Sequence, residues 1–202
     1  MSVPIVGILG GVGSGKTSVV RRVTDIRLQI VDADRIGHDL LLDPDVVCQL
    51  TQIFPATILD SSGQVVRSRL AQLVFGKDTE HKAALKQLEQ ILHPAIHREI
   101  KAQIQSVSAS VDAIILDAAI LLETGWADAC NHLIFVDTPE PLRIQRVKQN
   151  RNWTAEEFRR REKSQMPVES KKQRANFVVD NSGTIQKAAQ QLTDILMKLI
   201  DD

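Results

Sequence analysis

The segment Gly10-Gly11-Val12-Gly13-Ser14-Gly15-Lys16-Thr17 is the stretch of this chain that decides its fold. The apolar run Ile5 to Leu9 precedes it and a helical pattern follows, which is the strand–loop–helix context that a phosphate-binding loop requires. Glycines let backbone N–H groups turn inward and approach phosphate oxygens without a Cβ clash. A helix that begins near Lys16 directs the positive end of its dipole at the same phosphates. The segment therefore predicts a nucleotide-binding site.

Two side chains at the end of this loop have separate chemical roles. Lys16 supplies a mobile cation for the β- and γ-phosphates, and the hydroxyl of Thr17 is placed to ligate Mg²⁺. Kinases, ATPases and GTPases share this motif, so the loop alone does not choose among them. The residues that we expect to contact the nucleotide here are Gly10, Gly11, Val12, Gly13, Ser14, Gly15, Lys16, Thr17 and Ser18.

Further apolar runs alternate with helical patterns along the chain. The clearest helical pattern covers residues 185–199, where the apolar side chains fall on one face. This alternation predicts an α/β fold with a five-stranded parallel sheet flanked by helices and joined by right-handed crossovers. The four runs that we interpret as strands in addition to Ile5 to Leu9 are Ile30-Val31, Ile114 to Leu116, Leu133 to Val136 and Phe177 to Val179.

The spacing of these runs predicts the organisation of the chain, which we take as a single domain of 202 residues. Residues 36–110 form a mostly helical insertion between the second and third strands, suited to a second substrate. Within it, Pro94 should kink or break the long helical stretch near His93. Residues 143–174 form a lid. The remaining segments, 1–35, 111–142 and 175–202, form the nucleotide-binding core.

Acidic residues stand at or just beyond the ends of two predicted strands. Asp32 and Asp34 come at the end of the second strand, and strand alternation places both on the same side. Carboxylates at that sheet edge can accept a proton from a substrate hydroxyl or hold metal-bound water; the alternative is a helix cap beside a solvated neighbour. Asp117 ends the third strand, where it either supports the Mg²⁺ shell or is a plain strand-end carboxylate. Glu123 faces the same cleft or caps a helix.

The segment 143–174 carries eleven Lys or Arg residues against four Glu, a net charge of +7 in a chain whose overall net charge is zero. A solvated helical face accounts for most of these charges but does not require such a local excess. We interpret the segment as an arginine-rich lid that closes over the transferring phosphates, because the planar guanidinium binds phosphate bidentately and stays charged. A nucleic-acid surface is the weaker alternative, since the whole chain is neutral.

Composition sets the cellular context that we expect. Cys48 and Cys130 are far apart and have no metal-like spacing, which indicates two reduced thiols. The N-terminus has no basic region and no small-residue cleavage site, and no apolar stretch reaches the ~18 residues of a membrane span. We expect a cytoplasmic protein with no membrane or nucleic-acid partner, present as a monomer or a small homo-oligomer.

Five segments in this order resemble the dephospho-CoA kinase family, over nearly the whole chain. The phosphate loop is the first and Val31-Asp32-Ala33-Asp34 is similar to that family's Asp-Ala-Asp segment. The others are Leu92-His93-Pro94 with Arg67 to Phe75, then Leu116 to Gly125, and finally Val179-Asp180-Asn181-Ser182-Gly183. The Asp-Ala-Asp, His-Pro and Asp-Asn-x-Gly segments in this order are more specific than the phosphate loop alone.

The resemblance implies transfer of the ATP γ-phosphate, with Mg²⁺, to the ribose 3′-hydroxyl of dephospho-CoA. It implies that Asp34 is the base and that Lys16 and Arg146 assist catalysis. Thr17, Asp32 and Asp117 would serve the metal. Arg146 and Asn181 would contact ATP, the latter near the adenine, while lid positions match at Arg151, Arg161 and Gln165. The acceptor-binding residues that it implies are Asp34, His38, Arg67, Leu70, His93, Ile96, Leu121 and Glu123.

The chain departs from the family pattern at three positions. Ala119 stands where the family usually has Pro, Arg143 replaces a usual Gln, and Asn152 a usual Asp. These departures concern the central loop and the lid. Another small-molecule P-loop kinase, such as a shikimate or nucleoside kinase, stays open as an alternative, although the Gly-Gly-Arg-type acceptor loop of shikimate kinases is missing. A GTPase switch is disfavoured because no Asn-Lys-x-Asp motif occurs.

Overall fold

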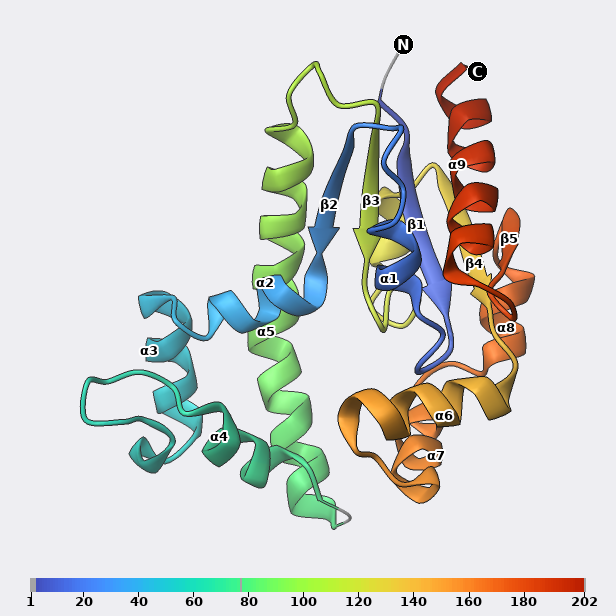
Figure 1. Cartoon of the computed structure of the whole chain (residues 1–202). Coiled ribbons are helices and arrows are strands. Elements are labelled where there is room, and N and C mark those ends of the chain that lie inside the picture. Colours follow the sequence, from blue (N-terminus) through green and yellow to red (C-terminus); the bar gives the residue numbers. More distant parts are fainter. Residues whose placement is uncertain (1–2, 77, 202) are drawn as a thin grey trace. The chain divides into compact units, whose positions relative to one another are not determined.

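The computed structural model describes residues 3–76 and 78–201, and the chain divides into two compact units (Figure 1). One unit comprises Met1–Asp32 and Ser106–Asp202, and the other comprises Ala33–Gln105. The insertion expected from the sequence spans 36–110, and its assignment to a second substrate stays a prediction.

The first unit is built on a five-stranded parallel sheet, as the sequence predicted. Its strand order is β2-β3-β1-β4-β5, so the two halves of the sheet diverge from β1, the strand that leads into the phosphate loop. Strand β3, between β2 and β1, is buried along its whole length, which explains its run of apolar residues. The strands are β1 (Ile5–Gly10), β2 (Leu28–Asp32), β3 (Ala113–Asp117), β4 (His132–Asp137) and β5 (Phe177–Asp180).

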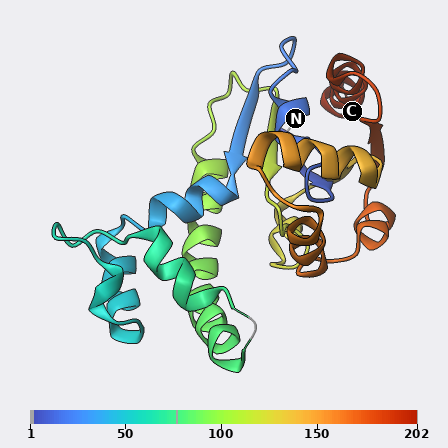
Figure 2. The ribbon, with the colours of Figure 1, turned by 60° about the horizontal axis from the view of Figure 1, so that its bottom comes forward.

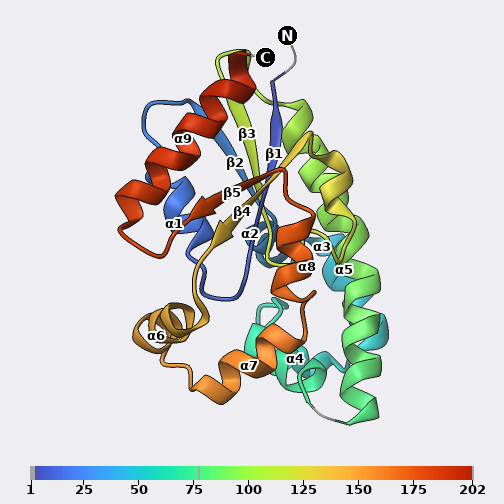
Figure 3. The same cartoon turned by 90° about the vertical axis from the view of Figure 1, so that its right-hand side faces the viewer.

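Helices cover both faces of this sheet. On one face, α1 (Lys16–Val20) and α9 (Ile185–Asp201) pack together and bury residues such as Val19, Leu192 and Leu196 in a common core (Figure 3). On the other face, α8 (Val168–Gln173) packs against β1 and β4. The described part of this unit also has α6 (Glu140–Arg151) and α7 (Ala155–Lys163), and a short 3-10 helix covers Trp126–Ala129. The region expected to be a lid, residues 143–174, contains most of α6 and all of α7 and α8.

The second unit is helical. Its longest helix is α5 (Thr79–Gln105), which packs against α2 (Ala33–Leu40), α3 (Pro44–Ile53) and α4 (Arg67–Val74), and a 3-10 turn covers Ala56–Ile58 (Figure 2). Leu50, Ile58 and Leu70 form the centre of its core. Asp43 caps α3 by accepting hydrogen bonds from the N–H groups of Asp45 and Val46, which fixes where that helix begins.

Of the two outcomes predicted at Pro94, a kink or a break of the long helix, the break is wrong, because α5 continues through Pro94 as one element of 27 residues. The kink stays a prediction. Proline removes one backbone hydrogen bond from a helix interior. The turns that follow Pro94 bury Ala95, Ile96 and Ile100, and this packing outweighs the loss of that bond.

Both cysteines are free thiols in different environments. Cys48 is exposed on α3. Cys130 lies against β1, where a Cβ at Gly7 would come within 2.9 Å of its Sγ, and burial raises the pKa of Cys130 to about 12. Among the described residues, no helix is both long enough and apolar enough to span a membrane.

Candidate active site

The phosphate loop joins the end of β1 to the start of α1 and depends on glycine backbone geometry. Gly13 and Gly15 have φ angles of +73° and +83°, in the left-handed region that side chains with a Cβ rarely adopt. The N–H of Ser14 donates to the carbonyl of Gly11 at 3.1 Å, and α1 begins at Lys16. The sequence thus folds here as the strand–loop–helix unit that its motif predicted.

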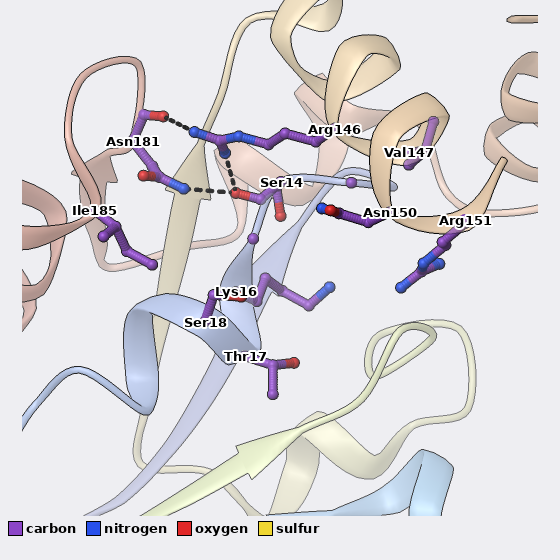
Figure 4. A pocket seen from close by; sticks show the side chains of 12 residues that line it. Ser14, Lys16, Thr17, Ser18, Arg146, Val147, Asn150, Arg151, Asn181 and Ile185 are labelled. Carbon is purple, nitrogen blue, oxygen red and sulfur yellow. Dashed lines mark hydrogen bonds between the residues drawn. The ribbon is translucent and has the colours of Figure 1, made fainter. Parts of the chain in front are cut away.

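One carbonyl of this loop is held by three donors. The Ser14 oxygen accepts from Thr138 Oγ1 at 2.9 Å, Asn181 Nδ2 at 2.7 Å and Arg146 Nη1 at 3.1 Å. In a planar trans peptide the C=O and the N–H point in opposite directions, so this grip also fixes the direction of the Gly15 N–H. The contact brings α6 and the loop after β5 onto the phosphate loop, as the dashed lines of Figure 4 show.

A cavity of about 380 Å³ opens beside this loop. Figure 4 shows the side chains of Lys16 and Thr17 from the loop and of Arg151 from α6 pointing toward one space. Positive groups that converge in a partly enclosed site bind phosphate strongly. The cavity is lined by Gly13, Ser14, Gly15, Lys16, Thr17, Ser18, Arg146, Val147, Asn150, Arg151, Asn181 and Ile185.

The oxygen donors expected to serve a metal lie at the ends of adjacent strands. Asp32 on β2 and Asp117 on β3 are register partners, and the hydroxyl of Thr17 donates to Asp117 Oδ2 at 2.5 Å. All three are oxygen ligands of the kind that Mg²⁺ prefers, and Mg²⁺ commonly uses one or two carboxylates together with substrate phosphates. Among the described residues, no group of three or more His, Cys, Asp or Glu side chains is placed to hold a metal.

The expectation that Asp32 and Asp34 share one side of a strand is wrong. Strand β2 ends at Asp32, and Asp34 lies in the first turn of α2, so the two-residue period of a strand does not apply to it. An acidic residue in the first turn of a helix is favoured by the helix dipole, which is a structural reason for a carboxylate at this position. The role of Asp34 as base stays a prediction.

The outer part of the lid region is organised around an aromatic ring. The guanidinium groups of Arg151 and Arg161 stack on Trp153, 4.8 Å and 4.1 Å from the ring centroid. Arg161 also donates to Glu157 at 3.1 Å. A cation held over an aromatic face keeps its position without using its N–H groups. The resemblance placed both arginines in the lid, and of the two Arg151 lines the cavity beside the phosphate loop.

Lys171 of α8 ties the end of the lid region to the segment after β3. This buried lysine donates to Ala119 O at 3.0 Å and to Gln165 Oε1 at 3.1 Å, and forms an ion pair with Glu123 at 3.0 Å. Glu123 also accepts from the N–H of Met166 at 2.7 Å. Burial raises the pKa of Glu123, but these hydrogen bonds outweigh it, and the pKa lies below its ordinary value. Glu123 therefore has a structural role within the first unit.

Several expected acceptor contacts lie in the second unit. Arg67 Nη2 and His38 Nε2 are 2.6 Å apart. His38 is four residues after Asp34 on α2, so both are on the same helix face. All three side chains are exposed.

The other expected acceptor contacts are more deeply placed. Leu70 and Ile96 are buried within the helical unit, and His93 is half-buried on α5. Leu121, in the sheet unit, is buried against β1. Hydrophobic packing alone explains why Leu70, Ile96 and Leu121 are apolar and buried. Their contact with an acceptor stays a prediction.

The sequence analysis missed three residues of the site. Thr138 was not noticed because its partner, Ser14, is 124 residues away. Asn150 lines the cavity but carries no motif. Arg143 was noticed only as a departure from a family pattern, although it is buried against the phosphate loop.

Comparisons with known proteins agree with this geometry. The family model for dephospho-CoA kinase matches residues 4–187. A dephospho-CoA kinase of Carboxydothermus hydrogenoformans is 34% identical over 96% of this chain and 94% of that protein. One from Corynebacterium diphtheriae is 36% identical over 93% of this chain and 94% of that protein.

Solved structures show the same fold. A Thermus thermophilus protein has a TM-score of 0.79 at 28% identity, covering 98% of this chain and 99% of that one. The dephospho-CoA kinase from Campylobacter jejuni has a TM-score of 0.66 at 20% identity, covering 98% of each chain, and bears on the fold alone.

Proposed function

The chain belongs to the dephospho-CoA kinase family, and from this premise we propose that it transfers the γ-phosphate of ATP to the ribose 3′-hydroxyl of dephospho-CoA. The products are coenzyme A and ADP. The observation that carries the proposal is the convergence of Lys16, Thr17 and Arg151 on the cavity beside the phosphate loop (Figure 4). A loose phosphoryl-transfer transition state is stabilised mainly by positioning and by neutralisation of charge, which these residues supply.

On the nucleotide side, the loop N–H groups and Lys16 bind the β- and γ-phosphates. Arg151 neutralises charge on the transferring group. Thr17, Asp117 and Asp32 would hold Mg²⁺, whose own contribution when bound is to offset the negative charge of the phosphates. Asp117 already accepts the Thr17 proton, which leaves the lone pairs of the Thr17 oxygen to face a cation. This donor set fits a hard cation.

On the acceptor side, we propose that Asp34 accepts the proton of the 3′-hydroxyl. A ribose hydroxyl is a poor nucleophile until its proton has an acceptor, and a positioned carboxylate supplies one. Arg67 donates a hydrogen bond to Nε2 of His38 when that nitrogen carries no proton. His38 lies on the same helix face as Asp34. These groups offer both charge and hydrogen bonds to a polar substrate. The proposal assigns acceptor binding to residues 33–105.

The proposed setting is the cytoplasm, with the protein as a monomer or small homo-oligomer and no nucleic-acid partner. Two free thiols support a reducing compartment. A net charge of zero supports small-molecule substrates over nucleic acid.

The proposal is tested by incubating the protein with ATP, Mg²⁺ and dephospho-CoA and measuring coenzyme A by mass. We expect product with ATP and little with GTP. Asp34→Asn should lower single-turnover phosphoryl transfer by ~10²–10⁴ with ATP affinity unchanged, because the variant keeps the shape but removes the base. Asp39→Asn is the matched control, since Asp39 is exposed on the same helix and pairs only weakly with Arg35 at 3.6 Å.

A magnesium titration separates the two roles proposed for the aspartates. Raising Mg²⁺ should partly restore Asp32→Asn, because a weakened metal site is filled by mass action. It should not restore Asp34→Asn. Full activity of Asp34→Asn, or its rescue by Mg²⁺, removes Asp34 from the role of base.

A further inference from the structure

An ion pair between buried Arg143 and half-buried Glu162 lies against the phosphate loop. Arg143 of α6 is 5% exposed, and its Nε donates to the carbonyl of Thr138 at 3.0 Å. Its Nη1 donates to the carbonyl of Val12 at 3.3 Å and pairs with Glu162 of α7. The guanidinium also lies 5.2 Å from the ring centroid of Phe158. One side chain thus joins the loop, α6 and α7.

The glycines of the loop rest on this pair. A Cβ at Gly11 would lie 2.6 Å from Arg143 Nη1 and 3.1 Å from Glu162 Oε1. A Cβ at Gly13 would lie 2.8 Å from the carbonyl oxygen of Arg143. A side chain at Gly11 would displace the pair, and one at Gly13 would meet the backbone of α6, so only glycine fits at either position.

The hydrogen bond to Val12 has a directional consequence for the cavity. Because the C=O and N–H of a planar trans peptide point in opposite directions, holding the Val12 carbonyl fixes the direction of the Gly13 N–H. Gly13 lines the cavity. Phosphate is bound in such loops by N–H groups that all point inward, so an amide that turns away weakens binding.

The carboxylate of Glu162 offsets the cost of burying the positive charge of Arg143 against this loop. A buried guanidinium is costly unless it is paired and its hydrogen bonds are satisfied. The charge links the loop to α7, the helix that also carries Arg161.

We propose that the Arg143–Glu162 pair is a positioning device that orients the Val12–Gly13 peptide for the β- and γ-phosphates and couples α7 to the phosphate loop. This proposal rests on one part of the proposed function, namely that the cavity binds a nucleoside triphosphate. The pair acts through the loop backbone, so its effect should grow with the number of phosphates on the nucleotide.

The test measures ATP, ADP and AMP affinities and the melting temperature of Glu162→Gln, Arg143→Gln and the double variant. Because no acceptor is present, the result does not depend on whether coenzyme A is formed. We expect Glu162→Gln to weaken ATP about tenfold, which corresponds to loss of about one strong polar contact. AMP binding should change less than twofold. Glu156→Gln, an exposed change on the same helix, should alter neither affinity.

The double variant tests the pairing itself. Glu162→Gln leaves Arg143 buried without a counter-charge, whereas the double variant removes both charges, so ATP affinity should recover most of the loss. Should Glu162→Gln fail to fold, Glu162→Asp keeps the charge, and a loss for ATP greater than for AMP then supports the proposal. Equal losses for all three nucleotides, strictly additive single effects, or a fall in melting temperature with unchanged affinities would each overturn it.

Discussion

Two pairs of arginines in the segment 143–174 differ in what holds them. The inner pair, Arg143 and Arg146, donates to backbone carbonyls of the phosphate loop and of the segments beside it. The outer pair, Arg151 and Arg161, is exposed and stacks on Trp153. A guanidinium that donates to carbonyls has used part of its N–H edge, whereas one stacked on a ring engages its face. The same residue type therefore shapes the binding loop in one place, whereas in the other Arg151 points into the cavity (Figure 4) and Arg161 is held by Glu157 as well as by the ring.

Of the two pairs, the outer one is expected to have the larger effect on rate. Arg151→Ala should lower turnover by ~10²–10³, because it removes a charge that stabilises the transferring phosphoryl group. Stability should change by no more than about 0.5 kcal/mol, since the side chain is exposed. Steady-state kinetics and thermal melting check both quantities. Lys148→Ala, an exposed basic residue on the same helix, is the control. A near-normal rate in Arg151→Ala would contradict the distinction drawn between the two pairs of arginines.

A smaller effect on rate but a larger one on stability is expected from the inner pair. Arg146→Ala removes the donors to the carbonyls of Ser14 and Asn181, and hydrogen bonds from a charged group contribute about 1.5–3 kcal/mol to folding. The KM for ATP should rise about tenfold as the Ser14–Gly15 peptide loses one support. Calorimetry and an ATP titration give the two values. If turnover instead falls as far as in Arg151→Ala while stability holds, Arg146 belongs with the outer pair.

A several-fold effect is expected from the ring itself. Trp153→Leu keeps an apolar side chain but removes the cation–π contacts, which contribute about 0.5–1 kcal/mol at exposed sites. Turnover should therefore fall about two- to fivefold, between wild type and Arg151→Ala. In the double variant Trp153→Leu/Arg151→Ala, the change at Trp153 should add little. An undiminished effect of Trp153→Leu in that background would show that the ring acts independently of Arg151.

The smallest effect on rate, together with an effect on stability that depends on pH, is expected at the anchor of the lid region, Glu123. Its pKa is held below the ordinary value by Met166 and Lys171 against the opposing effect of burial. The stabilisation from a depressed carboxyl pKa is complete above the unfolded-state pKa and is lost as pH falls through the folded-state pKa. Melting temperatures from about pH 6 to about pH 3 should fall more steeply for wild type than for Glu123→Gln. Parallel curves would exclude this contribution.

The sheet and the loop were predictable because their physical causes are local. The strand β3 is buried on both faces, which requires a continuous apolar run, and the glycines of the loop stand together in sequence. Asp34 was misplaced because nothing in Val31-Asp32-Ala33-Asp34 distinguishes the end of a strand from the start of a helix. The division of the arginines into a pair that donates to carbonyls and a pair that stacks on a ring was not predictable. The partners of Arg146, for example, are carbonyls of residues that lie 132 and 35 positions away along the chain.

The two thiols differ in exposure and pKa, so one of them can be labelled selectively. Alkylating reagents and maleimides react with the thiolate, so Cys130, whose pKa is raised to about 12, stays essentially unreactive at neutral pH. Cys48 is exposed on α3. A dye added to the wild-type protein therefore marks the helical unit of residues 33–105 alone, without any substitution. Its fluorescence during titration with dephospho-CoA, and separately with ATP, reports which of the two substrates that unit senses.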